Sequence, residues 1–125
     1  MVSEIQDYIL KTYAVEPECP FDDLESLVFR HRVNRKWFAL VMFSLPREKL
    51  GAKDGGTVDI LNLKCDPILQ GSLLDGRRYF PGYHMNKEHW LTVVLDGSVS
   101  MEELKPLIDF SFELTKTKKR KTLSP

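Results

Sequence analysis

The sequence has 125 residues, of which 42% are hydrophobic and 29% are charged. This length allows one domain around a single core and leaves no room for a second, and the composition excludes a largely disordered chain. Eighteen basic side chains balance eighteen acidic ones, which removes the argument that a strongly basic protein must bind nucleic acid or an acidic membrane.

Charge is nevertheless uneven along the chain. Residues 1–26 contain seven acidic residues and one lysine, whereas residues 27–53 contain seven basic residues and one acidic residue. The last ten residues contain five basic residues and no acidic one. Whether these blocks form separate surfaces depends on the fold, since neighbouring strands can interleave acidic and basic segments.

The cysteines and the amino-terminal sequence indicate the compartment. Cys19 and Cys65 are too few for a disulfide framework and neither belongs to a CxxC pair, so reduced thiols are expected. The start MVSEIQDYIL has no basic segment followed by a long apolar run, and no stretch approaches the ~20 apolar residues of a membrane span. We therefore predict a cytoplasmic protein with no membrane partner.

The first predicted element is a helix. Ser3 and Gln6 match a capping box, and apolar residues then recur on one helical face as far as Tyr13, which predicts a helix over residues 3–13. Prolines punctuate the sequence that follows. Residues 21–26 fit either a helical turn or an acidic loop, and the sequence does not choose between them.

A β-hairpin follows. Apolar and polar residues alternate over residues 27–33, Asn34-Arg35 offers a tight turn, and WFALVMFS predicts the second strand over residues 37–44. This second strand is apolar on both faces. It is therefore expected to be central, with helices on one side and a partner surface or more protein on the other.

The middle of the chain predicts a third strand and a short helix. Alternation indicates the strand over residues 58–64, and Asp66-Pro67 places an N-cap before a proline at the first helical position. The short helix is expected to run through about Leu74, and a loop over residues 77–87 follows it.

The last elements are a fourth strand over residues 89–95 and a long helix. Ser100 and Glu103 form a second capping box, and an apolar stripe continues to about Lys118, with Pro106 expected to kink the helix or delay its regular start.

These elements predict an α+β fold with helices packed on a largely antiparallel sheet. We expect a single domain over residues 1–118 and a frayed basic tail over residues 119–125.

Metal and catalytic sites are not indicated. His31, His84, His89 and Cys65 are the available soft ligands, but they follow no known metal-site spacing, which favours polar surface histidines. The sequence has no GxSxG motif, and Gly55-Gly56 precedes a strand rather than a phosphate-binding helix. We therefore predict no catalytic residues, no metal, no cofactor and no enzyme activity.

The hairpin is a candidate binding element because of its cations. Arg30 and Arg32 are expected to share a strand face while Arg35 and Lys36 lie at the turn, so four cations would form one wing that contacts phosphates. The competing interpretation, which is slightly favoured, is a solvated strand face paired with acids such as Asp59.

The segment RRYFPGYHMNKEHW, residues 77–90, interleaves cations with aromatic rings. Such a mixture suits a nucleic-acid surface or a protein-binding patch, and it equally suits a loop whose rings, such as Trp90, dock on the core. Its candidate binding residues are Arg77, Arg78, Tyr83, His84, Asn86, Lys87 and His89.

The sequence PGYHMNKEHWLTVVLDG, with KWFALV and LNLKCDP before it and LIDFSFEL after it, resembles the MmcQ/YjbR family of small bacterial proteins. The resemblance runs from about Pro20 to Leu114. It implies a compact fold of the CyaY-like, or double-wing, type, described as a predicted DNA-binding domain, and it implies no catalytic residues. The matched signature positions are His84, Asn86, Lys87, His89 and Trp90, whereas the KKRK tail is not part of the family pattern.

Two functions follow as hypotheses. The first is a non-enzymatic nucleic-acid-binding module in which the hairpin and residues 77–87 act as wings and the KKRK tail adds phosphate contacts. The second is a protein-interaction or small-ligand adaptor that uses the same loop without nucleic acid. Nucleic-acid binding should weaken steeply as salt rises, whereas an apolar protein interface should not.

Overall fold

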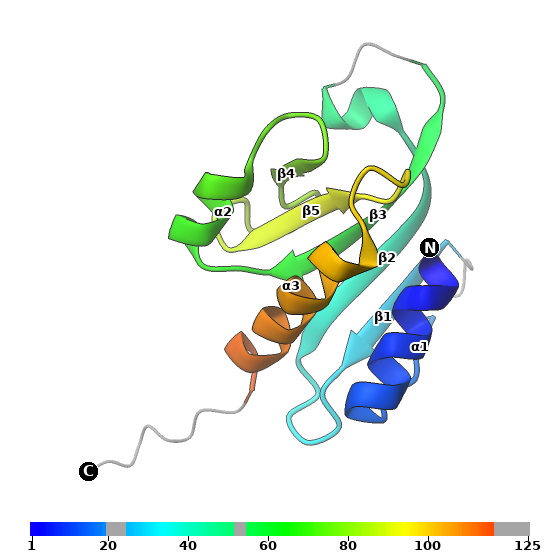
Figure 1. Ribbon diagram of the computed structural model, residues 1–125, viewed down its shortest axis with the longest axis vertical. Coiled ribbons are helices and arrows are strands. Elements are labelled where there is room, and N and C mark those ends of the chain that lie inside the picture. Colours follow the sequence, from blue (N-terminus) through cyan, green and yellow to red (C-terminus); the bar gives the residue numbers. More distant parts are fainter. Residues whose placement is uncertain (20–24, 52–54, 117–125) are drawn as a thin grey trace.

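The computed structural model describes residues 1–19, 25–51 and 55–116. Within these residues the chain forms a five-stranded sheet in the order β1-β2-β3-β5-β4, and every neighbouring pair is antiparallel (Figure 1). The predicted α+β class and antiparallel sheet are confirmed. The elements in chain order are α1 (Val2–Tyr13), β1 (Ser26–Arg30), β2 (Trp37–Pro46), the 3-10 helix η1 (Arg47–Leu50), β3 (Thr57–Lys64), α2 (Pro67–Leu73), β4 (Tyr79–Pro81), β5 (Trp90–Val94) and α3 (Met101–Leu114).

Helices α1 and α3 cover one face of the sheet (Figure 1). Each helix buries an apolar stripe, with Ile5 and Ile9 from α1 and Leu104 and Ile108 from α3 fully enclosed. This burial supplies the main stabilisation, since a fully buried aliphatic side chain contributes roughly 1.5–3 kcal/mol. The strand residues in the same core are Phe29, Phe38, Ala39, Val41, Leu61, Leu63, Tyr79, Leu91 and Val93.

The opposite face of the sheet has a second, smaller apolar cluster. Ile60 and Val94 are its buried centre, and Leu50 of η1, Phe80 of β4 and Tyr83 pack against it. β2 was expected to be covered on both faces. The chain itself supplies both covers, with α1 and α3 on one face and the second apolar cluster on the other. β2 is an interior strand between β1 and β3, whereas β3 occupies the centre of the sheet.

Two of the predicted helix starts are confirmed in detail. The Asp66 carboxylate accepts the Leu69 N–H at 2.8 Å at the start of α2. At the start of α3, the Ser100 hydroxyl accepts the Glu103 N–H at 3.2 Å, and the Glu103 carboxylate accepts the Ser100 N–H at 3.0 Å. α3 ends at Leu114, earlier than expected, and Pro106 lies inside it.

The capping box predicted at Ser3 and Gln6 is wrong. α1 begins at Val2, so Met1 is its N-cap and no side chain caps it. Ser3 therefore lies inside the first turn, where its hydroxyl has no cap position to fill.

The sequence also missed one strand. β4 is only three residues long and ends at Pro81, within the segment expected to be a loop. Of the undecided segment 21–26, residues 21–24 lie outside the described residues, as does the tail over residues 119–125. None of the described helices is long and apolar enough to cross a membrane.

Candidate functional site

A connection over residues 31–36 joins β1 to β2. The His31 N–H donates to the Lys36 carbonyl at 2.9 Å, and the Arg35 N–H donates to the His31 carbonyl at 3.1 Å. Arg35 has a left-handed φ of 65°, and the Asn34 side chain accepts the Lys36 N–H at 2.8 Å. A turn is thus present where Asn34-Arg35 predicted one, but the connection over residues 31–36 is longer than the tight turn that was expected.

The strand before this turn is shorter than expected. β1 ends at Arg30, where the register against β2 shifts, and Arg32 lies in the turn. The expectation that Arg30 and Arg32 share a strand face is therefore wrong. Arg30 packs instead over the Trp37 ring, with 5.7 Å between its guanidinium carbon and the ring centroid.

Glu18 pairs with two of the four hairpin cations. Its carboxylate lies 3.1 Å from Arg30 Nε and 3.0 Å from Arg35 Nη2. Two backbone hydrogen bonds between Glu18 and Val28, at 2.9 and 2.8 Å, hold it beside β1. The expectation of a paired strand face is thus correct in kind, but the acid is Glu18.

Asp59, the acid expected to pair with the hairpin, has a different role. Its carboxylate accepts the Ser44 N–H at 2.9 Å, where the pairing of β2 with β3 is irregular. The other two hairpin cations, Arg32 and Lys36, are exposed, and neither forms an ion pair with any residue in the described ranges. Val33 between them is 90% exposed.

The end of α3 is fixed to this turn. The His31 ring nitrogen Nε2 lies 2.7 Å from the Thr115 hydroxyl, and the Asn34 side-chain amide donates to the Thr115 carbonyl at 2.9 Å. Lys116 follows directly, and the sequence then continues with the basic residues Lys118, Lys119, Arg120 and Lys121. Lys116, the last described residue, therefore lies close to the basic turn.

His31 is buried, so its assignment as a surface histidine is wrong. It is 6% exposed and packs against the rings of Phe38 and Phe112, with centroids 5.2 and 4.2 Å away. Burial lowers the pKa of His31, and the nearby charges of Lys116 and Lys36 act in the same direction. A neutral imidazole is thus the favoured form in this packed position.

The connection between β4 and β5 is held by the polar groups of the family signature. The Asn86 side chain accepts the backbone N–H groups of Glu88 and His89 at 2.9 and 3.0 Å, and its carbonyl accepts the Trp90 N–H at 3.1 Å. Lys87 Nζ donates to the Gly82 carbonyl at 3.1 Å. Asn86 and Lys87 thus use their side chains to shape the loop.

Gly82 and Trp90 close this loop. The Gly82 N–H donates to the Trp90 carbonyl at 2.9 Å, and a Cβ at Gly82 would lie 2.6 Å from Trp90 Cβ, closer than real Cβ atoms come. Trp90 is 8% exposed, which agrees with its expected docking on the core. Its ring lies 5.5 Å from Lys64 Nζ on β3.

Two buried polar residues clamp Tyr83 to the sheet. The Tyr83 N–H donates to the Thr92 hydroxyl at 2.8 Å, and its carbonyl accepts the Asn62 side-chain amide at 3.2 Å. The Thr92 hydroxyl donates in turn to Asn62. Because Asn62 and Thr92 are completely buried on neighbouring strands, they fix the loop backbone without reaching solvent.

Strand pairing places the loop over residues 82–89 at the same end of the sheet as the hairpin turn. Trp90 at the start of β5 pairs with Lys64 at the end of β3, and Trp37 starts β2 beside the end of β1. On this loop His84 and His89 are exposed, and His84 lies against the Tyr83 ring at 4.2 Å between centroids.

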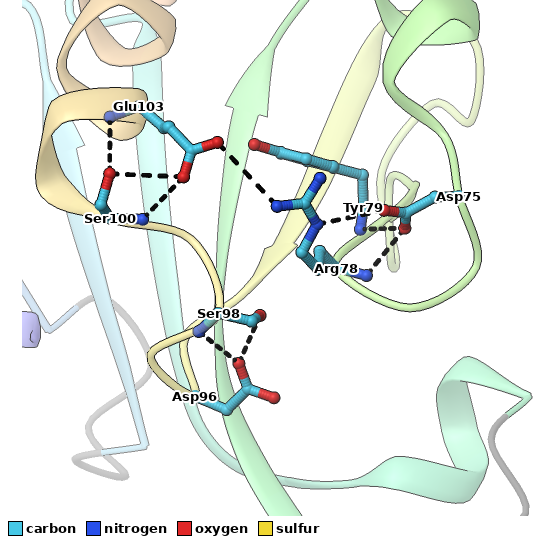
Figure 2. Close-up of polar contacts among 7 residues, drawn as sticks. All are labelled: Asp75, Arg78, Tyr79, Asp96, Ser98, Ser100 and Glu103. Carbon is cyan, nitrogen blue, oxygen red and sulfur yellow. Dashed lines mark hydrogen bonds and ion pairs between the residues drawn. The ribbon is translucent and has the colours of Figure 1, made fainter.

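Arg77 and Arg78 lie at the other end of the sheet, because β4 separates them from that loop. Figure 2 shows Arg78 between two acids: its guanidinium lies 3.2 Å from Asp75 and 3.9 Å from Glu103. Asp75 also accepts the N–H groups of Arg77, Arg78 and Tyr79, and these bonds hold the pKa of its carboxyl well below the usual range. The structure thus does not bring Arg77 and Arg78 to the hairpin cations.

The candidate metal ligands do not meet. Among residues 1–19, 25–51 and 55–116, no three His, Cys, Asp or Glu side chains are grouped so that they could hold a metal ion. Cys65 is 2% exposed, and burial raises the pKa of its thiol to about 11, so the neutral thiol is the stable form.

Sequence reasoning missed several residues that build this region. Glu18 and Thr115 belong to no sequence motif. Their roles become visible only through contacts with residues 12 or more positions away in the sequence. Asn62 did give a signal, since it is an amide inside the apolar run DILNLK. Gly82 gave no signal, because glycine is required there only by the close approach of Trp90 in the folded chain.

Known proteins resemble this chain in sequence and in fold. The YjbR family model matches residues 10–114. The uncharacterized protein YyaQ of Bacillus subtilis is 41% identical over 114 residues, which cover 90% of this chain and 96% of YyaQ. The uncharacterized protein YbdF of Escherichia coli O157:H7 is 45% identical over 60 residues, covering 46% and 48% of the two chains.

Solved structures have the same fold. A crystal structure of a Pseudomonas syringae protein superimposes with a TM-score of 0.82 at 42% identity, over 91% of this chain and 97% of that one. The Deinococcus radiodurans protein DR2400, described as a DUF419 domain, gives a TM-score of 0.72 at 30% identity over 94% and 80% of the two chains. The sequence resemblance is therefore confirmed, and the chain belongs to the YjbR family.

Proposed function

We propose that this chain is a non-enzymatic nucleic-acid-binding module of the cytoplasm that contacts phosphates through the hairpin end of its sheet. The observation that carries the proposal is the fixed position of Thr115, which is bonded to His31 and Asn34 in the turn. This contact joins two basic segments that are far apart in sequence, and phosphate binding draws its affinity from such clustered cations.

The turn has cations free to bind. Arg32 and Lys36 are exposed and make no ion pair with a described residue, whereas Glu18 already pairs with Arg30 and Arg35. Exposed ion pairs of this kind are weak, so Arg35 can exchange Glu18 for a phosphate at little cost. Phosphate binding thus rests first on Arg32 and Lys36, and then on Arg35 and the tail.

The tip of the turn offers an apolar contact as well. Val33 is 90% exposed between the two free cations. Proteins that enter the minor groove combine such cations with an apolar side chain that contacts or wedges between bases. The turn therefore suits contact with both the backbone and the bases.

The proposal is non-enzymatic because of how the signature residues are used. Asn86 and Lys87 direct their polar groups at the loop backbone, which leaves His84 and His89 as its exposed titratable groups apart from Glu88. Acid–base catalysis requires groups held within reach of one reacting atom, and no described contact joins these histidines to an acid or a nucleophile.

A protein partner is the second candidate. It is favoured by Ile68 on α2, which is 87% exposed, together with Val33 on the turn. α2 follows β3 in the chain, whereas Val33 lies in the connection between β1 and β2, so the two side chains offer apolar contacts on separate elements. An interface built on these apolar groups should be insensitive to salt, whereas binding through the cations should not.

The test compares two double variants by fluorescence anisotropy with a labelled duplex and a labelled single strand at two salt concentrations. Arg32→Glu with Lys36→Glu should weaken binding at least about tenfold, since two phosphate contacts are replaced by repulsion. Arg30 is left intact, because it packs on Trp37 and its replacement would disturb the fold.

The matched control is Lys11→Glu with Lys49→Glu, which makes the same change in net charge at exposed sites outside the turn. This control should bind nearly as well as the unchanged protein. Lack of binding to either nucleic acid at low salt, or equal weakening by both double variants, would contradict the proposal. Binding of a protein that persists at high salt would favour the second candidate.

A further inference from the structure

A cavity of about 300 Å³ lies at the end of the sheet opposite the hairpin turn. It is within the size range of small-molecule sites. We infer that it binds a small phosphomonoester that carries a flat apolar group, the class that includes nucleoside monophosphates. The cavity is lined by Arg47, Leu50, Gly76, Arg77, Arg78, Phe80, Val94, Asp96 and Ser98.

The apolar part of the cavity comes from three elements. Phe80 of β4, Val94 of β5 and Leu50 of η1 belong to the same packed cluster on this face of the sheet. Val94 is almost completely buried, whereas Phe80 and Leu50 keep partial exposure. A flat ring placed on this surface would remove apolar area from water and could stack on Phe80.

The anion is assigned to Arg47 and Arg77. The guanidinium of Arg77 forms no ion pair with a residue of the described ranges, and Arg47 Nη2 lies 3.7 Å from the Asp96 carboxylate, beyond hydrogen-bond distance. Guanidinium groups bind phosphate through paired N–H donors, and neither arginine side chain donates a hydrogen bond to another described residue.

Two acids near the cavity, Asp75 and Glu103, pair with Arg78 rather than with the arginines assigned to the anion. Asp75 accepts the backbone N–H groups of Arg77 and Arg78 at 2.8 Å each and thereby fixes the turn that presents Arg77. Figure 2 shows that Arg78 bonds Asp75 and lies beside Glu103, so those two acids already have a cation. Neither Asp75 nor Glu103 lines the cavity.

Asp96 gives the cavity an acceptor. One carboxylate oxygen accepts the Ser98 N–H at 3.0 Å and the Ser98 hydroxyl at 2.6 Å (Figure 2). The other oxygen faces Arg47 and retains acceptor capacity. Burial acts to raise the pKa of Asp96, but the bonds from Ser98 and the charge of Arg47 outweigh it and lower that pKa. An ionised Asp96 can thus accept a hydrogen bond from a hydroxyl or amino group of the ligand.

This site is independent of nucleic-acid binding at the hairpin. β2 runs for ten residues between the turn and Arg47, so the two regions share no residue. Loss of duplex binding would leave the cavity intact, and loss of ligand binding would leave the hairpin cations intact.

The experiment is a titration of the ¹⁵N-labelled full chain with adenosine monophosphate, followed by NMR. Saturable amide shifts are expected at Gly76, Arg77 and Ser98, with a dissociation constant in the millimolar range or tighter. Adenosine alone and inorganic phosphate alone should each bind at least about tenfold more weakly, because each lacks half of the recognised chemistry.

Two variants and one control make the assignment specific. Arg77→Gln removes an exposed cation and should weaken binding about tenfold, the usual effect of losing a charged hydrogen bond. Phe80→Leu keeps an apolar side chain but removes the flat ring, and it should also weaken binding. Lys11→Gln makes the same charge change as Arg77→Gln on α1 and should leave binding unchanged.

The inference is overturned by any of three outcomes. These are the absence of saturable shifts around the cavity, equal binding of inorganic phosphate or adenosine and the monophosphate, and unchanged binding in Arg77→Gln.

Discussion

At Gly82 the end of β4 meets Trp90 so closely that a side chain has no room. The nearest atom to an added Cβ is Trp90 Cβ at 2.6 Å, and the carbonyl oxygens of Asn86 and Trp90 each lie 3.1 Å away. Trp90 cannot move aside without disturbing its hydrogen bond with Gly82. The position of the whole loop over residues 82–89 thus depends on having glycine, which has no side chain, at position 82.

We predict that Gly82→Ala lowers the free energy of unfolding by about 1–3 kcal/mol, as expected for overpacking at a rigid site. Gly71→Ala is the matched control, because a Cβ at Gly71 meets nothing within 4 Å and the residue lies in helix α2. That change should be neutral or stabilise by up to roughly 1 kcal/mol. Urea unfolding of both variants measures the difference, and equal effects would refute the steric argument.

At the scale of elements, two serines that look alike in sequence have different roles. Ser100 and Ser3 each precede a Glu or Gln by three positions, but only Ser100 caps a helix. The difference arises because α1 begins at Val2, one residue before Ser3. The pattern of two residues cannot by itself fix where a helix begins.

This difference gives a prediction for helix stability. Ser100→Ala should lower the free energy of unfolding by about 1 kcal/mol, since the Glu103 N–H loses its side-chain acceptor. Ser3→Ala should change it by less than roughly 0.5 kcal/mol, because Ser3 makes no cap bond. Thermal or urea unfolding tests both; a loss of stability at Ser3 that matched the loss at Ser100 would show that Ser3 acts as a cap.

The other elements show where sequence patterns are sufficient. Two helix starts, the hairpin and the third strand depend on local signals, which are alternation, capping residues and a turn dipeptide. All four elements were predicted, although the first hairpin strand ends three residues earlier than expected. β4 could not be predicted, because three residues ending in Pro81 have too short a pattern and form a strand only by pairing with β5. The pairing of Glu18 with the hairpin depends on tertiary contact in the same way.

For the molecule as a whole, the sheet has two chemically different ends. The hairpin turn, the loop over residues 82–89 and the end of α3 lie at one end, and Arg47, Arg77 and Asp96 lie at the other. The sequence grouped Arg77 with His89 because they are close along the chain. The antiparallel strand between them separates the two residues in space, and only the fold could show this.

A truncation tests the role assigned to the tail. We predict that a chain ending at Lys116 keeps its melting temperature, because Thr115 supplies the bonds that fix the end of α3 to the turn within the part of the chain that the structure describes. It should bind a duplex more weakly and with a shallower salt dependence, by up to about 0.9 in log–log slope for each phosphate that the tail would otherwise neutralise. Identical salt slopes for the two chains would show that the tail does not bind phosphate.

The hydrogen bonds of Thr115 to the hairpin also make binding by the tail an intramolecular event. If the turn binds a nucleic acid as proposed, the cations that follow Lys116 in the sequence are covalently linked to the bound turn, and such linkage gives effective concentrations of about the millimolar range. A free peptide with the sequence of the tail would lack this advantage. The proposed function therefore requires only weak phosphate binding from the tail by itself for the tail to raise the affinity of the intact chain.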